Sequence, residues 1–419
     1  MIKPTLALIP SGQKATKVYS VLPSNGTGDF TFARTGEATR VRKDGLIEAV
    51  ATTVPRLDWL NSDCPILLLE PARTNRQVRS EQFDNAAWTK QADITVTANQ
   101  VTALTGELTA DKIKRGSTTN TNNFLSDSAN KSASSALDAC TSVFVKQGEG
   151  DFFAMRAQGS GLNQVNGVYQ FSTNTFTTSA DGSGFTVTSS KVENYGSGWY
   201  RLSIVYNTDT AATITSVFSP RGSTGDVDDT DTSTSAFVYL WGCQVEEGVG
   251  STSYIETPAD AAVTRNAETC NSAGDANTFN DNNGVLYAEI AALSDDLTFR
   301  SIAISDGTLD NRILIRYRTT SNRINILIEG SNVVAVNSTQ ALTDITNYSK
   351  FALKYKSGDI ALWVNGVEIF TDTTTFIISG LDRLSFDGGN GADDFYGKVK
   401  DLRYYNTALT DAELKELTT

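Results

Sequence analysis

The segment GDVDDTDTS gathers four carboxylates within six positions, on Asp226, Asp228, Asp229 and Asp231. Calcium takes roughly six to eight oxygen ligands, and alternating carboxylates on one loop can supply several of them. The glycine and the distant glutamate of an EF-hand do not follow in register. The segment is therefore either a calcium site or a solvated acidic loop. Calcium is the one cofactor for which the sequence offers a candidate.

A second polar segment, FDGGNGADDF, carries Asp387, Asn390, Asp393 and Asp394 among glycines. Loops on a rigid sandwich are where binding residues concentrate, and carboxylate and amide groups there can hydrogen-bond a sugar. The alternative is a plain turn in which glycine and asparagine supply positive φ. Trp363 is a fifth candidate sugar contact, provided that its ring faces outward beside the Asn-Gly pair that soon follows it.

Four other aromatic residues, Trp88, Trp199, Tyr200 and Trp241, have flat faces that suit stacking on a sugar ring. However, Trp241 lies in an alternating run, YLWGCQ, and large aromatic side chains dominate the cores of β-sandwiches. We therefore predict that these four are core residues.

Histidine is absent from the chain. Its absence excludes Ser-His-Asp and Cys-His nucleophile systems, a histidine general base and histidine-ligated metals. The remaining classes are a binding protein and a hydrolase that uses carboxylates. Glycoside hydrolysis needs two carboxylates within about 5 to 9.5 Å, and no short motif singles out a pair among the 48 acidic residues. We predict no catalytic residue and no enzymatic activity.

Charge and hydropathy exclude further classes. The chain has 48 acidic and 35 basic residues, a net charge of -13, which disfavours binding to nucleic acid and to anionic membranes. It has no run of about 18 apolar residues, so we expect no membrane insertion. The N-terminus lacks the apolar core of a secretory signal, so we expect a soluble chain that its own signal does not export. The four cysteines are widely spaced and should be free, mostly buried thiols.

The elements that must position these residues are mainly strands. SKFALKYK places Phe351, Leu353 and Tyr355 on one face, and this period of two predicts half-buried strands. The Asn-Gly pair in DIALWVNGVEIF predicts a hairpin. A capping box, Thr410 with Glu413, predicts a short C-terminal helix. We predict an all-β fold of two antiparallel sandwiches after a small irregular, β-containing N-terminal region.

Turn-rich stretches divide the chain into regions. In PILLLEPARTN, residues 66–69 predict one buried strand that Pro71 ends. The predicted regions are residues 1–79, which are irregular, residues 80–264, a Thr/Ala/Asn-rich linker at residues 265–279, and residues 280–419. Each of the two larger regions has the size of a single β-sandwich.

The motifs FTFARTGEATRVRKDGLIEAVATTVPRLDW, CPILLLEPARTN and SEQFDNAAWTK, in this order, resemble a module series of tailed-phage virion proteins. In that series a small N-terminal element leads through a leucine-rich strand and a Glu-Pro-x-Arg-Thr-Asn turn into a carbohydrate-binding-module-like jelly roll. GELTADKI, TSVFVKQGEG, GSGWYRLSIVY and VYLWGCQVEEGVGSTSYIETPADAAVTR extend the match over residues 29–265. Residues 76–78, Arg-Gln-Val, depart from the leucines that related sequences have there.

Residues 280–419 are similar to a concanavalin-like, laminin-G-type jelly roll, through FALKYKSGDIALWVNGVEIF and YGKVKDLRYYNTALTDAELKEL. Such motifs specify a fold, whereas function depends on sites grafted onto it. The two resemblances together imply two antiparallel jelly-roll β-sandwiches and leave the ligand open.

The resemblance implies a structural virion protein of a tailed phage, a surface appendage or fibre subunit whose lectin-like modules adhere to host-surface glycan. Its implied partners are further copies of itself in a homotrimer, other virion proteins that residues 1–79 contact, and the glycan. It would be made in the host cytoplasm and lie on the virion surface, where many copies make weak sites sufficient. The alternatives are a capsid or tail decoration or spike protein with a purely structural role, and a polysaccharide-degrading enzyme.

Overall fold

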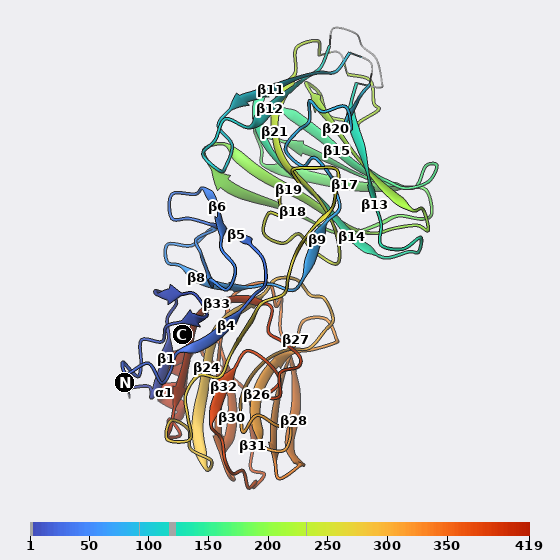
Figure 1. The fold of residues 1–419 in the computed structure, drawn as a ribbon. Coiled ribbons are helices and arrows are strands. Elements are labelled where there is room, and N and C mark those ends of the chain that lie inside the picture. The colour runs from blue at the N-terminus through green and yellow to red at the C-terminus, as the bar shows by residue number, and fades with distance from the viewer. Residues whose placement is uncertain (1–2, 92, 117–122, 232) are drawn as a thin grey trace. The chain divides into compact units, whose positions relative to one another are not determined.

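The computed structural model describes residues 3–91, 93–116, 123–231 and 233–419. In these ranges its regular structure consists of β-strands and a single helix (Figure 1). Backbone contacts group the chain into two compact units, Met1–Glu37 with Val50–Pro71 and Asn266–Thr419, and Ala38–Ala49 with Ala72–Arg265. We call them the terminal unit and the central unit. The predicted all-β class with antiparallel sandwiches is confirmed.

The terminal unit contains two main antiparallel sheets and a smaller one. The larger sheet has the order β31 (Val367–Asp372), β30 (Ile360–Val364), β29 (Ser349–Lys356), β24 (Asn283–Ala292), β33 (Gly397–Tyr405), β8 (Ile66–Leu69) and β7 (Arg56–Asp58), and β1 (Leu6–Leu8) also pairs with β33. The second has the order β28 (Val333–Ala341), β27 (Arg323–Gly330), β26 (Arg312–Tyr317), β25 (Arg300–Ser305) and β32 (Arg383–Ser385). The small sheet has the order β2 (Gln13–Lys14), β3 (Lys17–Val18), β4 (Phe30–Ala33) and β23 (Thr269–Asn271).

Alternate side chains of these strands build the core of the terminal unit. Phe351, Leu353 and Tyr355 of β29, predicted to share a face, are all fully buried in its largest apolar cluster. The second sheet contributes Ile304 and Ile313 to the same cluster. Because side chains alternate along a strand, β29 also has an opposite face, and helix α1 (Asp411–Thr418) packs against β29 and β30 there.

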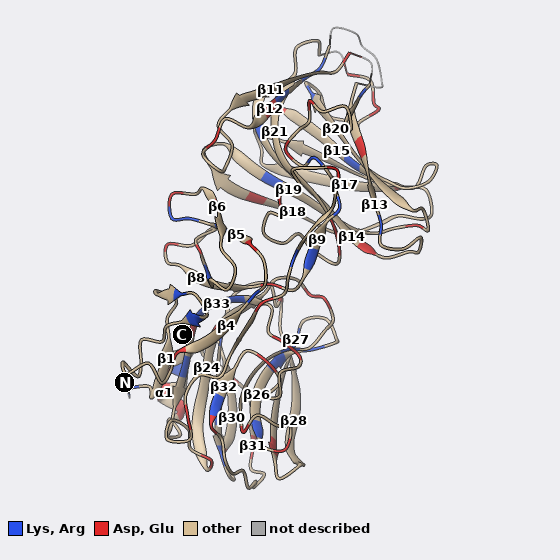
Figure 2. Ribbon diagram, viewed as in Figure 1, with Lys and Arg blue, Asp and Glu red and all other residues tan. Residues whose placement is uncertain are grey.

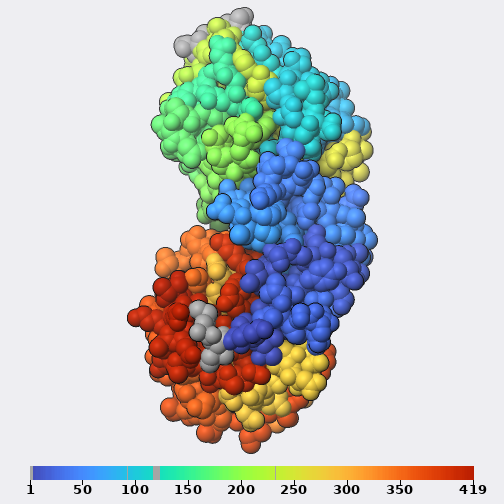
Figure 3. Space-filling view, turned by 90° about the vertical axis from the view of Figure 1, so that its left-hand side faces the viewer, coloured from blue at the N-terminus to red at the C-terminus, as the bar shows by residue number. Residues whose placement is uncertain are grey.

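The first strands of the chain share a sheet with the last one. β1 runs antiparallel to β33, with Leu6 opposite Tyr404, and Figure 3 shows the dark blue N-terminal residues against the red C-terminal ones. β8, the predicted strand, has all its residues buried and also pairs with β33. The predicted boundaries set residues 1–79 apart from residues 280–419, whereas strands from both ranges share one core. A strand this short cannot bury its apolar face alone.

Two predictions from local sequence motifs in the terminal unit, the Asn-Gly hairpin and the capped C-terminal helix, are confirmed. Asn365 and Gly366, between β30 and β31, have φ values of 48° and 81°, the positive pair that a type I′ turn requires. Thr410 caps α1 as predicted: its backbone N–H donates to the Glu413 carboxylate at 2.9 Å, and the Glu413 N–H donates to its hydroxyl at 3.4 Å.

The central unit is a sandwich of two six-stranded antiparallel sheets. One has the order β10 (Thr89–Lys90), β13 (Leu125–Asn130), β20 (Thr213–Arg221), β15 (Phe152–Gln158), β16 (Gln164–Gln170) and β17 (Thr175–Asp181). The other has the order β11 (Thr95–Val101), β12 (Ala110–Lys114), β21 (Phe237–Glu247), β14 (Asp138–Glu149), β19 (Trp199–Asn207) and β18 (Thr186–Gly196). Two strand pairs complete the topology, β9 (Arg73–Asn75) with β22 (Val263–Arg265), and β5 (Ala38–Val41) with β6 (Ile47–Val50).

The large aromatic residues of the central unit are core residues, as predicted. Trp88, Trp199 and Trp241 are at most 2% exposed. Trp88 packs against Phe83 with ring centroids 4.9 Å apart, and the half-buried Tyr200 packs against the same core. These aromatic rings are therefore part of the scaffold.

The remaining sequence expectations concern thiols, charge and membranes. All four cysteines are free, Cys140, Cys243 and Cys270 buried and Cys64 exposed, which confirms the prediction of mostly buried thiols. Figure 2 shows acidic and basic residues interspersed along the chain, on strands as well as on loops. Within the described ranges, no helix has the length and hydropathy needed to cross a bilayer.

Candidate functional site

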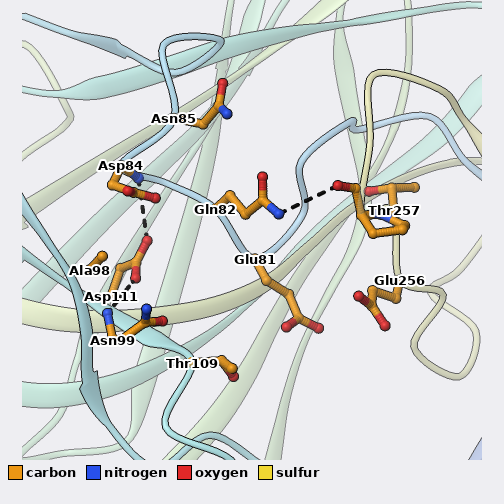
Figure 4. Close-up of a pocket in the computed structure, with 11 residues that line it drawn as sticks. Glu81, Gln82, Asp84, Asn85, Ala98, Asn99, Thr109, Asp111, Glu256 and Thr257 are labelled. Atoms are coloured by element: carbon orange, nitrogen blue, oxygen red, sulfur yellow. Dashed lines mark hydrogen bonds between the residues drawn. The ribbon is translucent and has the colours of Figure 1, made fainter.

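A polar cavity of about 450 Å³ lies in the central unit (Figure 4), a size within the range of small-molecule sites, roughly 300 to 1,000 Å³. Three stretches of chain build it: residues 81–85 after β9, the paired strands β11 and β12, and residues 256–258 after β21. Among the described residues, no lysine or arginine lines it. Its carboxylates and carboxamides belong to Glu81, Asp84, Asp111, Glu256, Gln82, Asn85 and Asn99.

Asp111, on β12, is held by backbone groups from two of these stretches. It is 1% exposed, and its carboxylate accepts the N–H of Asn99 at 2.9 Å and the N–H of Asp84 at 3.3 Å. The first donor is available because the β11–β12 register shifts between Thr97 and Val101, and Asn99 has a φ of 56° there. Burial raises the pKa of Asp111 to about 6, although the Asn99 hydrogen bond lowers it.

Glu81 stands at the end of a chain of hydrogen bonds. The Thr257 N–H donates to the Ser80 hydroxyl at 3.0 Å, and that hydroxyl lies 2.8 Å from the hydroxyl of Tyr254. Tyr254 in turn donates to Glu81 Oε1 at 2.9 Å. The pKa of Glu81 is raised to about 7, first by burial and then by the negative charge of Glu256, while the Tyr254 hydrogen bond lowers it.

The cavity offers hydrogen-bonding groups without a bound counter-charge. In the described ranges none of its four carboxylates forms a salt bridge, and the nearby Lys90 instead donates to the carbonyl oxygens of Asp84 and Asn85. Carboxylates accept hydrogen bonds and carboxamides both donate and accept them, which suits the hydroxyl groups of a sugar. The neighbouring Glu81 and Glu256, side by side in Figure 4, also match the chemical requirement for a proton donor beside a carboxylate.

Sequence reasoning missed this cavity. Glu81 and Tyr254 are 173 residues apart along the chain, and no residue-spacing rule connects SEQFDN with YIETP. The one available signal was that both segments carry a glutamate directly beside a turn at the edge of the predicted jelly roll. The fold alone brings them together.

The predicted calcium loop lies folded against the outer side of its own sheet. Val227 is fully buried with Ala154 and Val217, and this apolar contact fixes the loop. Two of the predicted ligands, Asp226 and Asp229, border a shallow hollow of about 290 Å³ that residues of β16 and β17 also line.

Three of the four aspartate carboxylates of this loop already have partners within the protein. Asp231 is buried and accepts the N–H groups of Gly222 and Ser233, each at 2.9 Å. Asp228 forms a 2.7 Å ion pair with Arg156. Asp229 accepts the N–H of Asp226 at 2.8 Å. Among the residues that the structure describes, no group of three or more acidic or cysteine side chains is placed to hold a metal, and calcium binding stays a prediction.

The predicted sugar-binding loop of the terminal unit is a tight turn after β32. Asp387 is 3% exposed and accepts the N–H of Gly389 at 2.6 Å, so this carboxylate holds the turn itself together. Asn390 and Asp393 are exposed, and Asp393 has a φ of 57°. Burial raises the pKa of Asp394. The loop thus brings the predicted residues together, and sugar binding by them stays a prediction.

Trp363 does not belong to that group. It lies on β30 and is only 8% exposed, packed with Leu414 and Leu417 beneath helix α1. The expectation of an outward-facing ring is wrong, because the C-terminal helix covers this face of the sheet.

Comparison with protein families finds a match for one part of the chain. Residues 250–415 match the family model of the concanavalin A-like lectin/glucanases superfamily. A search of curated proteins found no match to the chain.

Solved structures with similar folds cover about a third of the chain. The CBM40 of the Ruminococcus gnavus IT-sialidase, bound to α2,3-sialyllactose, is 18% identical over 36% of this chain and 94% of its own, with a TM-score of 0.29. Domain 4 of the Geobacillus stearothermophilus arabinanase AbnA, with arabinotriose, is 17% identical over 41% and 82%, with a TM-score of 0.30. Sheep galectin-11 is 9% identical over 30% and 86%, with a TM-score of 0.21. With TM-scores this low, the ligand of none of these structures can be assigned to this chain.

Proposed function

We propose that this protein is a structural virion protein of a tailed phage, a surface appendage or fibre subunit, that adheres to host-surface glycan without cleaving it. The polar cavity between residues 81–85, β11–β12 and residues 256–258 carries the glycan part of the proposal, because its carboxylates and amides suit sugar hydroxyls. The superfamily match of residues 250–415 supports it. The virion assignment rests on the ordered sequence motifs, and the homotrimer is proposed only from the resemblance to phage fibres.

Adhesion is tested with the full chain, because a truncation at Arg265 would remove β33, the partner of β1 and β8. Purified protein is incubated with host cells and with their extracted surface polysaccharide. We expect binding that Glu256→Gln weakens and that Glu368→Gln, an exposed change on β31 of the terminal unit, leaves intact. Absence of binding by assembled wild-type protein would contradict adhesion and favour the structural decoration role.

Polysaccharide hydrolysis is a second candidate, favoured by one observation. Glu81, with its pKa raised to about 7, stands beside Glu256, and such a pair can act as acid and base. Release of new reducing ends from host polysaccharide, abolished by Glu81→Gln, would establish hydrolysis in place of simple adhesion. We expect none to be released.

A further inference from the structure

Strands at the edge of a sheet leave backbone N–H and C=O groups open to a further strand, and charged residues on such strands oppose that pairing. In the described chain the four largest sheets have eight edge strands, and six of these carry a charged residue: β7, β10, β17, β18, β31 and β32. β28 and β11 carry none. Of these two, only β28 (Figure 1) has strongly exposed large apolar residues, Val333 at 66% and Val334 at 50%. β28 is thus the edge most open to another strand.

A groove of about 700 Å³ lies beside the start of β28. Its walls are β28 and residues 374–377, which follow β31, and among the described residues no charged side chain lines it. Ile377, on the wall opposite β28, is strongly exposed. Along this edge the core of the terminal unit is incompletely covered. The partly buried apolar residues that pack against the core all belong to β28, to β31 or to the residues shortly after them: Ala335, Leu342, Ile369, Phe370 and Phe376.

Contacts within the terminal unit hold the groove in shape. The side-chain oxygen of Asn311 accepts the N–H of Ser331 at 3.0 Å and the N–H of Ser379 at 3.4 Å, which ties the turn before β28 to the opposite wall. The two walls also touch directly, because a Cβ atom on Gly330 would lie 1.9 Å from the carbonyl oxygen of Ile377. A partner therefore meets a surface that is already ordered, which lowers the entropic cost of binding.

We propose that β28 pairs with β28 of a second copy of this chain, antiparallel and across a two-fold axis, so that two five-stranded sheets become one. Two-fold contacts are the commonest between identical subunits. The chain has a net charge of -13, so two copies repel each other wherever acidic surfaces meet. Residues 330–343, between Glu329 and Asp344, carry no charge. Any antiparallel register of this segment against itself therefore brings only uncharged residues together.

The size of this edge suits a specific but reversible contact. A strand of nine residues is about 30 Å long, and the edge of a two-layered sandwich with its side chains is roughly 20 Å deep. The edge thus offers roughly 600 Å² per copy, at the lower end of specific interfaces, and we expect a dimer that forms at micromolar concentration. The inference does not rest on glycan binding. It also differs from the three-fold contact of the proposed homotrimer, since in a trimer it would join two trimers.

Sedimentation equilibrium of the full chain tests the contact. We expect the mass, whether of one subunit or of one trimer, to double as the concentration rises through the micromolar range. Val334→Lys puts a charge on the edge of each copy and should weaken the doubling at least about tenfold. Val333→Lys, at a more exposed position, should do the same and guards against misfolding of the first variant. Leu162→Lys, a strongly exposed position of the central unit, is the matched control and should change nothing.

Hydrogen exchange of peptides from residues 333–341 locates the contact. Protection of β28 should rise with concentration in the wild-type protein and not in Val334→Lys. The inference is overturned if both lysine variants on β28 associate like the wild type, or if neither the mass nor the protection of β28 depends on concentration. Protection of β28 by host polysaccharide at constant mass would assign the groove to glycan and would overturn it too. Failure of the proposed adhesion is recognised separately, since it leaves the mass and the exchange of β28 unaffected.

Discussion

Replacing Glu268 by alanine should strongly destabilise the terminal unit. Its side chain is fully buried and accepts hydrogen bonds from Arg34 Nη1 at 2.6 Å and from Arg56 Nε at 2.9 Å. It also accepts the backbone N–H of Glu70 at 2.9 Å, and Glu70 pairs with Arg56 at 2.7 Å. Residues 34, 56 and 70 come from the start of the chain, so this network links the N-terminal strands to the β23 region.

The expected loss of stability follows from the buried arginine charge that the substitution leaves without its partner. Without Glu268, two buried arginines face one buried glutamate, and breaking a buried pair in this way costs about 3 to 5 kcal/mol. Adding the separate hydrogen bonds at about 1.5 to 3 kcal/mol each would overestimate the loss, because members of one network are not additive. For a unit of roughly 200 residues, this loss lowers Tm by about 6 to 20 °C.

The assay is scanning calorimetry, combined with hydrogen exchange of peptides from β8 and β33 to assign the transition to the terminal unit. Asp382→Asn is the matched control, because its ion pair with Arg383 is well exposed and should contribute at most about 1 kcal/mol. If Glu268→Ala lowered Tm no more than Asp382→Asn, the reasoning about buried charge would be refuted.

Four further predictions concern other parts of the molecule. Glu81 has a pKa of about 7 in the folded protein against an ordinary 4.5, so its contribution to the stability of the central unit should be lost as pH rises from about 4.5 to 7, by at most about 3 kcal/mol. Asp111, whose pKa is raised to about 6, adds a loss of the same sign at lower pH. Glu81→Gln should therefore reduce the slope of a denaturation-versus-pH profile, most clearly between about pH 6 and 7, and an unchanged slope there would contradict the shift. Trp363→Ala should cost about 3 to 5 kcal/mol, measured by urea unfolding, because it empties the contact beneath α1; a loss below 1 kcal/mol would show that the helix does not depend on it. Chelation with EDTA should leave Tm unchanged, since the carboxylates of Asp228, Asp229 and Asp231 have protein partners. A fall in Tm that calcium reverses would establish the calcium site. A thiol reagent should label one cysteine of the native chain, Cys64, because the other three are buried; rapid labelling of a second would contradict the fold.

Local patterns in the sequence were sufficient to predict several strands, one turn and the helix of the fold. Alternating residues 350–356, the Asn-Gly pair and the Thr410 capping box each involve neighbours within one strand, turn or helix, so their physics does not depend on the rest of the chain. The same holds for the aromatic core residues, whose burial follows from their size and apolar area.

The burial of Trp363 could not be predicted from its sequence neighbours. Its position beside a hairpin was read correctly, but which face of β30 is covered depends on α1, about 50 residues further along the chain.

By itself the sequence excluded histidine chemistry through its composition, and its local patterns predicted an all-β sandwich, several strands and the C-terminal helix. The tertiary structure decided which distant segments meet. Residues 1–37 and 50–71 join the unit of the C-terminal sandwich, and Glu81, Asp111 and Glu256 share one cavity. The physical reason is that strand formation depends on neighbouring residues, whereas burial, unpaired charge and pKa depend on every segment that packs around a side chain.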